Sequence, residues 1–340
     1  MGLLIKGQWH DQWYETKSNK GHFIREDAQF RNWITKDGRP GPNKRKGFRA
    51  QAGRYHLYVS GACPWAHRTL IFRQLKGLEE LIGVSVVHPH MLQSGWEFRK
   101  EGEDSRFVDH LYELPCMHGL YTKCDPQYTG RVTVPVLWDK ETEQIVSNES
   151  SEIIRMFNSS FNELTGNHEN YYPIEHQQEI NEWNDLIYRT FNNGVYRCGF
   201  ATTQTAYAES FVELFETLDR IEEHLADNTY LCGSKLTEAD WRLFPTLIRF
   251  DPVYHGHFKC NQRRIKDYPQ LFGYTRRLLH YPGILKTVDL WQIQQHYYFS
   301  HETINPSRVV PLGPDMQAYA EPPVDESAAI LETPTTELSG

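Results

Sequence analysis

One cysteine of the chain, Cys63, stands directly before a predicted helix. The strand-like segment 54–60 is broken by Gly61 and Ala62, and apolar residues at helical spacing follow from 64 to 75. The helix begins with proline, which costs no hydrogen bond because the first N–H of a helix has no intrahelical partner. The free N–H groups and the dipole of a helix start stabilise negative charge, so this position favours the thiolate of Cys63.

The residues around this cysteine limit what a thiolate could do. Ala66 occupies the position, three residues after Cys63, where a dithiol oxidoreductase has its resolving cysteine. No two of the six cysteines are spaced as C-x-x-C, so neither a disulfide framework nor a structural zinc site is expected. A lone thiolate can attack a substrate sulfur, form a mixed disulfide and wait for an external thiol. The alternative is a buried, inert cysteine.

The segments around Cys63 follow the order of a small α/β domain of the thioredoxin type, which is strand, helix, strand and then strand, strand, helix. The first two strands are parallel if the helix between them is a crossover. Pro135 confines the third strand to a start or an edge, or requires a special bond geometry there. The predicted elements are strand 54–60, helix 64–75, strands 83–87, 132–137 and 145–146, and a helix over 147–157.

The rest of the chain divides by composition and periodicity. After a polar linker the pattern is helical, and Thr237 with Asp240 resembles a capping box. Pro, Thr, Glu and Ser at the C-terminal end indicate a disordered tail. The predicted parts are an N-terminal arm (1–52), a thioredoxin-like domain (53–157) with an insertion (89–130), an all-helical domain (174–314) with helices near 175–191, 206–227, 237–249 and 268–280, and the tail (315–340).

Length and composition exclude several classes of protein. The 340 residues suffice for about two domains, and no apolar run approaches the ~20 residues that span a bilayer. The first residues lack the features of a signal peptide, which favours the cytoplasm. With 36 basic and 44 acidic residues the net charge is -8, which argues against nucleic acid as a partner. The histidines at 88, 90, 255 and 257 lack partners at ligand spacing, so no metal site is expected.

Several segments of the chain carry a resemblance to a known family, namely GQWHDQWYETK, FRNWIT, SGACPWAHRTLIFRQLKGLE, RVTVPVLWD, IVSNESSEIIRMFN, LTEADWRLFPTLIRFDPVYHGHFKC and HYYFSHETINPSRVVPLGP. Together they resemble the glutathionyl-hydroquinone reductases, also called Xi-class glutathione transferases. The similarity extends from about residue 2 to 314. It implies a thioredoxin-like domain followed by a helical glutathione-transferase domain, a homodimer, and glutathione and glutathionylated hydroquinones as substrates. Glutathione is then a cosubstrate, with no bound cofactor and no metal.

The resemblance also implies roles for single residues. Cys63 matches the catalytic thiol, and Tyr196 and Tyr297 match tyrosines that could protonate the leaving carbon. Val134 matches the residue before a cis-proline, a bond geometry that recurs in tight positions. The implied glutathione-binding residues are Trp96, Arg131, Val134, Glu149 and Ser150, and those of the aromatic substrate pocket are Tyr196, Tyr254 and Tyr297.

In the implied reaction, the Cys63 thiolate attacks the glutathione sulfur of an aromatic thioether and a pocket tyrosine protonates the carbon. A second glutathione then releases glutathione disulfide. Two alternatives remain at this point, namely a thiol transferase acting on glutathione mixed disulfides and a non-catalytic binding protein of the same fold. Simple packing is the alternative for Trp96 and Tyr196, and a surface ion pair is the alternative for Arg131.

Overall fold

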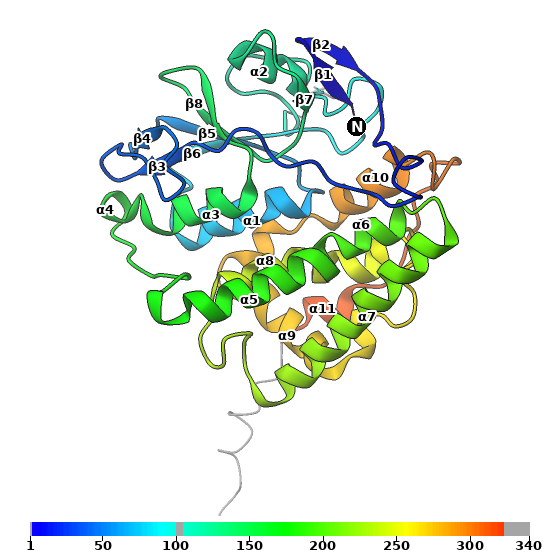
Figure 1. Ribbon diagram of the computed structural model, residues 1–340. Coiled ribbons are helices and arrows are strands. Elements are labelled where there is room, and N and C mark those ends of the chain that lie inside the picture. The colour runs from blue at the N-terminus through cyan, green and yellow to red at the C-terminus, as the bar shows by residue number, and fades with distance from the viewer. Residues whose placement is uncertain (1, 100–104, 323–340) are drawn as a thin grey trace, which may run out of the picture.

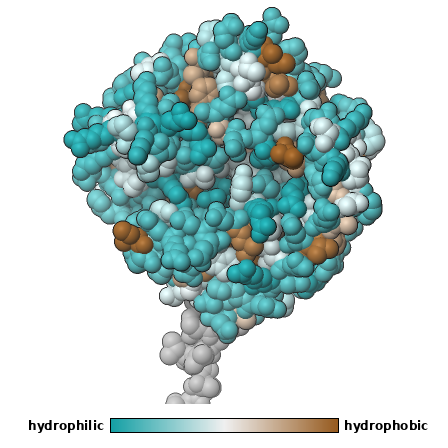
Figure 2. Space-filling model, viewed as in Figure 1, coloured by the Kyte–Doolittle hydropathy of each residue, from teal (hydrophilic) through white to brown (hydrophobic). Residues whose placement is uncertain are grey.

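The structure, a computed structural model, describes residues 2–99 and 105–322. Figure 1 shows the strands gathered at one end of the molecule, with helices α1 (Pro64–Leu75) and α3 (Ser150–Ser159) beneath the sheet. Helices α5 (Gln177–Ile187), α7 (Gln204–Asp227) and α9 (Pro269–Leu279) lie below these two. The face seen in Figure 2 is mainly hydrophilic, and its hydrophobic residues lie in small separate groups. No helix within the described residues is long and apolar enough to cross a membrane.

The N-terminal half contains the predicted thioredoxin-like domain. Its four-stranded sheet has the order β6-β5-β8-β9, in which β5 pairs parallel with β6 and antiparallel with β8. Pro135 lies one residue before β8, so it removes no hydrogen bond from the ladder. The bounds are β5 Tyr55–Val59, α1 Pro64–Leu75, β6 Ile82–Val86, β8 Val136–Asp139, β9 Gln144–Ser147 and α3 Ser150–Ser159.

The predicted arm contains four short strands. Strands β1 and β2 form a hairpin, and β1 also pairs with β7, which lies at the end of the insertion. Strands β3 and β4 form a separate parallel pair. Strands of three residues are too short to show alternation in a sequence, so they were not predicted. Their bounds are β1 Leu3–Ile5, β2 Gln8–His10, β3 Trp33–Thr35, β4 Gly47–Arg49 and β7 Gly130–Arg131; the insertion also contains α2 Met117–Cys124.

The second half is helical, and the four helices predicted there are present. The capping box before α8 is confirmed, since the Thr237 side chain accepts from the backbone of Ala239 and the Thr237 N–H donates to Asp240 at 2.8 Å. Helices α6 and α10 were not predicted. The bounds are α4 Asn162–Thr165, α5 Gln177–Ile187, α6 Gly194–Gly199, α7 Gln204–Asp227, α8 Glu238–Arg249, α9 Pro269–Leu279, α10 Leu290–Ser300 and α11 Gln317–Ala320, with π-helical turns at Tyr188–Asn192 and Phe250–Tyr254.

The first residues of the predicted tail are packed against the domain. Helix α11 lies against α9, and the buried Tyr319 donates a hydrogen bond of 2.6 Å to Asp251. The prediction of a disordered tail from residue 315 is therefore wrong for residues 317–320, because the buried ring of Tyr319 packs them against the helical domain. Residues 323–340 of the predicted tail lie outside the described residues.

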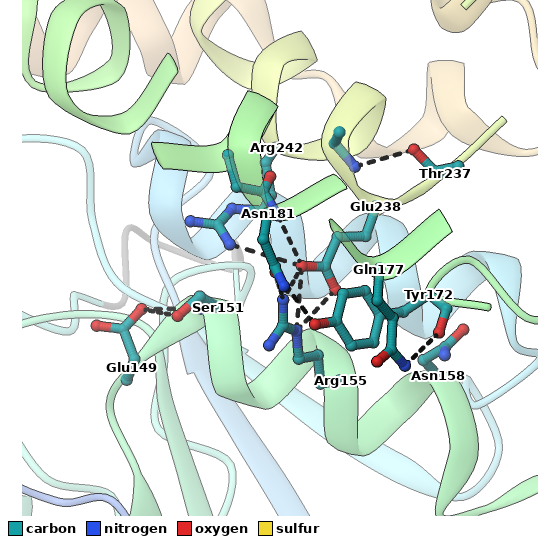
Figure 3. Close-up of polar contacts among 12 residues, drawn as sticks. Glu149, Ser151, Arg155, Asn158, Tyr172, Gln177, Asn181, Thr237, Glu238 and Arg242 are labelled. Atoms are coloured by element: carbon teal, nitrogen blue, oxygen red, sulfur yellow. Dashed lines mark hydrogen bonds and ion pairs between the residues drawn. The ribbon is translucent and has the colours of Figure 1, made fainter. Parts of the chain in front are cut away.

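A buried polar network joins the two halves (Figure 3). Arg155 of α3 donates to the carboxylate of Glu238 of α8 at 2.8 and 3.1 Å, and its guanidinium lies 3.8 Å from the ring centroid of Tyr172. Asn184 of α5 donates to the same carboxylate at 3.0 Å. Because Glu238 is buried and fully engaged, the network fixes how α3 lies on the helical half.

Candidate active site

Cys63 lies where the helix start was predicted. It is the residue before α1, with Pro64 at the first helical position, and its Sγ lies 3.5 Å from the carbonyl oxygen of Val134. All six cysteines are free thiols, and Ala66 is buried in the first turn of α1. The bond between Val134 and Pro135 is cis, as the resemblance implies. The arrangement brings one thiol to the cis-proline segment.

The ionisation expected for Cys63 from the helix start is opposed by its burial. Only 9% of the residue is exposed, and this loss of hydration raises the pKa of the thiol above its usual value. The backbone N–H groups of Ala66 and Trp65 and the charges of Arg249 and Arg25 act in the other direction. The helix start thus favours the thiolate of Cys63, as expected, while burial favours the thiol and has the larger effect on the pKa.

Two adjoining cavities lie near the start of α1 and share Arg25, Trp65 and Val134 in their linings. The first, of about 700 Å³ with its open mouth, is lined by Arg131, Val134, Glu149 and Ser150. The second, of about 540 Å³, is lined by Cys63 and by many aromatic side chains. Four of the five predicted glutathione residues thus share one cavity, and Trp96 lies in the other. The second cavity is lined by Trp13, Tyr14, Phe23, Arg25, Cys63, Trp65, Trp96, Thr133, Val134, Tyr196, Phe200, His296, Tyr297 and His301.

The first cavity contains a helix start. Ser150 is the first residue of α3, and the side chain of Glu149 caps the helix by accepting from the N–H of Ser151 at 2.8 Å. The Ser151 hydroxyl also donates to Glu149, at 2.7 Å. Free N–H groups at such a position suit the carboxylate of a ligand. A carboxylate ligand here would meet the N–H and the hydroxyl of Ser150.

Arg131 holds the arm against the wall of the first cavity. Its guanidinium donates to the carbonyl oxygens of Gln12 and Trp13 and pairs with Glu26 at 3.2 Å. It also lies 4.1 Å from the ring centroid of Tyr14. The residue is only 8% exposed, so the alternative of a solvated surface ion pair does not describe it.

The three predicted tyrosines form a chain of hydroxyl groups. The Tyr196 oxygen on α6 lies 2.6 Å from that of Tyr297 on α10, which lies 2.9 Å from that of Tyr254. Tyr196 and Tyr297 line the second cavity, whereas Tyr254 is fully buried and lies behind Tyr297, away from the lining. Burial raises the pKa of all three, so each retains its proton near neutral pH.

Several polar groups of the second cavity were not predicted. Arg25 of the arm lies 4.9 Å from the ring centroid of Tyr196 and 5.0 Å from that of Trp65 and lines both cavities. His296 donates from Nδ1 to the carbonyl oxygen of Pro89 at 2.8 Å, and its ring stacks on Trp96 with centroids 4.8 Å apart. Burial lowers the pKa of His296 to about 4, so the ring is neutral. The aromatic residues of the arm, Trp13, Tyr14 and Phe23, were the feature of the sequence that could have indicated that the arm lines this cavity.

Two indole groups beside Cys63 are unsatisfied. The Nε1 atoms of Trp65 and Trp96 are buried and have no hydrogen-bond partner in the described part of the chain. Buried N–H groups without partners are rare in folded proteins. Because both residues line the second cavity, a bound molecule with acceptor atoms could satisfy them. Within residues 2–99 and 105–322, no group of three His, Cys, Asp or Glu side chains is placed to hold a metal ion.

A thioredoxin-like domain with a cysteine before its first helix, a cis-proline beside that cysteine and a helical second domain are the features of a glutathione transferase. The glutathione S-transferase N-terminal domain family matches residues 62–160, and the corresponding C-terminal domain family matches residues 204–277. The chain belongs to the glutathionyl-hydroquinone reductases, the Xi class of these transferases.

Relatives support this assignment along most of the chain. The glutathionyl-hydroquinone reductase YqjG of Escherichia coli (strain K12) is 54% identical over 92% of this chain and 95% of its own length. The glutathionyl-hydroquinone reductase PcpF of Sphingobium chlorophenolicum is 51% identical over 92% of this chain and 96% of its own length. The glutathione-bound structure of YqjG has a TM-score of 0.87 at 50% identity, covering 96% of this chain and 100% of that one. The structure of the Xi glutathione transferase from Phanerochaete chrysosporium has a TM-score of 0.81 at 50% identity, covering 86% of this chain and 97% of that one.

Proposed function

We propose that this protein is an enzyme that uses glutathione to reduce glutathionyl-hydroquinones to hydroquinones. The observation that carries the proposal is that the cavity lined by Cys63 adjoins another cavity of different character, with Val134 lining both. One contains the helix start at Ser150, which suits the glutathione peptide, and the other is lined by aromatic rings with two tyrosine hydroxyls, which suits a hydroquinone. The relatives named as glutathionyl-hydroquinone reductases support the same substrate class.

The first half-reaction transfers glutathione to Cys63. Its thiolate attacks the glutathione sulfur of the aromatic thioether, so that a sulfur–sulfur bond forms while the carbon–sulfur bond breaks. The electron pair of the broken bond stays with the aromatic carbon, which takes a proton from a tyrosine hydroxyl of the second cavity. Tyr196 and Tyr297 are the two tyrosines that line this cavity beside Cys63. The hydroquinone then leaves.

The second half-reaction restores the enzyme. The thiolate of a second glutathione attacks the glutathione sulfur bound to Cys63, which releases glutathione disulfide and the Cys63 thiolate. The proton lost by this second glutathione replaces the one given to the aromatic carbon. The hydroquinone carbon has then gained two electrons, which come from the thioether sulfur of the substrate and the thiol of the second glutathione as these two sulfurs become a disulfide. The missing thiol at Ala66 is consistent with an external thiol at this step.

The residues of the first cavity are proposed to hold glutathione. Ser150 and the start of α3 bind the γ-glutamyl carboxylate, and Glu149 binds the neighbouring amino group. The backbone of Val134 pairs with the cysteinyl part, which directs the sulfur toward Cys63. Arg131 acts through the arm that it holds, and Trp96 covers the sulfur from the second cavity.

The aromatic half of the substrate is proposed to lie in the second cavity, in contact with Tyr196 and Tyr297. Tyr254 supports this site from behind through its hydrogen bond to Tyr297. We also propose a homodimer and a location in the cytoplasm, where a reducing environment keeps thiols free; the six free cysteines support such a location.

A single-turnover assay tests the proposal. A glutathionylated hydroquinone mixed with enzyme, without free glutathione, is expected to yield one equivalent of hydroquinone and one glutathione bound at Cys63. A thiol transferase would leave the aromatic thioether unchanged yet react with a glutathione mixed disulfide. A binding protein would react with neither, and either result would reject the proposal.

A further inference from the structure

Arg249, the last residue of α8, reaches from the helical domain into the turn that carries Cys63. Its side chain is completely buried. Nε donates to the carbonyl oxygen of Ala62 at 2.8 Å, and Nη2 donates to that of Gly61 at 2.9 Å. One guanidinium therefore holds both carbonyl groups that directly precede Cys63, and a planar fork with several donors is suited to such a task.

The other hydrogen-bond partners of the Arg249 guanidinium are also uncharged. Nη1 donates to the carbonyl oxygen of Pro245 at 2.9 Å and to Nδ1 of His67, also at 2.9 Å. Because Nδ1 of His67 accepts, its proton lies on Nε2, which is 2.8 Å from the Thr287 hydroxyl. Burial, and then the charge of Arg249, keeps the pKa of His67 well below its usual value. The positive charge of this pair thus stays on Arg249.

Arg249 lacks the carboxylate partner that two less deeply buried arginines of the chain have. Arg54 pairs with Asp139 at 2.7 Å and Arg155 with Glu238 at 2.8 Å. Arg249 forms no ion pair with a carboxylate among the residues that the structure describes. A buried cation without a counter-ion is unfavourable, and an anion that forms nearby relieves this cost.

We propose that Arg249 is a positioning residue for Cys63, which fixes the turn before it through two carbonyl groups and supplies the permanent counter-charge of its thiolate. The turn holds the sulfur at the start of α1, where the N–H groups of Trp65 and Ala66 face it. The charge acts each time Cys63 becomes an anion, that is, before attack on the substrate and again when the mixed disulfide is resolved. This inference rests on the proposed function only for its effect on turnover.

The other charged and titratable groups around Cys63 do not replace Arg249. Arg25 faces the sulfur from the arm, but it is partly exposed and lines the cavities that a substrate fills. Tyr196 faces it from α6 and is neutral because burial raises its pKa. Arg249 faces it from α8, and its charge also lowers the pKa of Cys63. A ligand that displaces or screens Arg25 leaves Arg249 unchanged.

Two substitutions separate the charge from the hydrogen bonds. Arg249→Gln retains an amide donor but removes the charge, and Arg249→Lys retains the charge with fewer donors. Arg68→Gln is the matched control, because Arg68 is another buried arginine without a carboxylate among its hydrogen-bond partners, which are Asn192 and the carbonyl oxygen of Arg242. The readout is the pH dependence of Cys63 alkylation by iodoacetamide, with the modified site identified by mass spectrometry.

Removal of the charge is expected to raise the pKa of Cys63 by about one unit, as loss of a nearby opposite charge does. Alkylation of Arg249→Gln at pH 7 then falls by about tenfold, and its rate approaches that of the wild type above the thiol pKa. Arg249→Lys and Arg68→Gln keep the wild-type profile. An unchanged profile for Arg249→Gln, or one for Arg249→Lys that moves by a full unit, would overturn the proposal.

Folding and catalysis are controlled separately. Circular dichroism and thermal melting establish which variants fold. If Arg249→Gln does not fold, the test rests on Arg249→Lys, and a shift of its Cys63 pKa by a full unit overturns the proposal. Alkylation requires no hydroquinone, so its result stands even if the single-turnover assay rejects the proposed function. Conversely, an active enzyme with an unchanged profile in Arg249→Gln would reject only the role of Arg249.

Discussion

The hydroxyl oxygens of Tyr196 and Tyr297 lie 2.6 Å apart although 101 residues separate them in the chain. Tyr297 also bonds to Tyr254 at 2.9 Å, and each hydroxyl has a single proton to donate. If Tyr254 donates to Tyr297 and Tyr297 donates to Tyr196, the proton of Tyr196 is left to face the cavity. We therefore expect Tyr196 to be the direct donor, supported by the two tyrosines behind it.

Tyr196→Phe is expected to slow the reduction of an aromatic thioether by at least about tenfold, because positioned acids contribute ~100-fold to 10,000-fold. Tyr297→Phe is expected to act in the same direction, and Tyr254→Phe less, because Tyr254 does not line the cavity. Exchange with a small glutathione mixed disulfide, in which no carbon is protonated, should keep its rate. Equal losses on both substrates would point to damaged folding or glutathione binding instead.

Cys63→Ser is expected to abolish turnover of the aromatic thioether, since serine cannot form the mixed disulfide. Cys198→Ser and Cys260→Ser are matched controls, as both cysteines are buried in the helical half away from the two cavities. These variants should keep most of the activity. Mass spectrometry after incubation with substrate should find one glutathione, at Cys63. A glutathione attached at another cysteine would contradict this mechanism.

The reactivity of ligand-free Cys63 should depend steeply on pH. Burial raises the pKa of its thiol, so the thiolate is the minor form at neutral pH and its fraction grows about tenfold per pH unit below the pKa. The rate of alkylation by iodoacetamide should therefore increase from about pH 7 to pH 9 without a plateau. A rate already constant below pH 7 would mean that the helix start and the two arginines outweigh burial.

Glu238→Ala is expected to lower the free energy of unfolding by about 3–5 kcal/mol, because it leaves the partly buried Arg155 without its counter-charge. Urea denaturation followed by circular dichroism measures this loss. Glu163→Ala is the control, since Glu163 and its partner Lys36 are more than half exposed. Removal of that pair should cost less than about 1 kcal/mol. Similar losses for both variants would show that the interdomain network adds no special stability.

The features that could be predicted are those set by neighbouring residues. Pro64 after a broken strand indicates the helix start that bears Cys63, and Thr237 with Asp240 indicates the start of α8. The order of strands and helices was sufficient for the thioredoxin-like fold, which is confirmed. Helix α10, in contrast, has aromatic and polar residues all round, so no apolar stripe distinguishes it in the sequence.

The features that could not be predicted depend on contacts between distant segments. Arg25 follows no periodic pattern, and its place beside Cys63 depends on the path of the arm. Arg131 was expected to contact the peptide, but its donors are taken by backbone oxygens of the arm, over 100 residues earlier. The burial that raises the pKa of Cys63 likewise arises only when both halves and the arm come together, whereas a helix start is visible locally.

The tryptophans that line the second cavity can report on its occupancy through their fluorescence. Trp13, Trp65 and Trp96, three of the nine tryptophans, lie around the space next to Cys63. Indole emission responds to polarity and is quenched by nearby quinone rings. Occupancy of the cavity could thus be followed by intrinsic fluorescence without a label, and replacing these tryptophans one at a time with phenylalanine would show which of them senses the ligand.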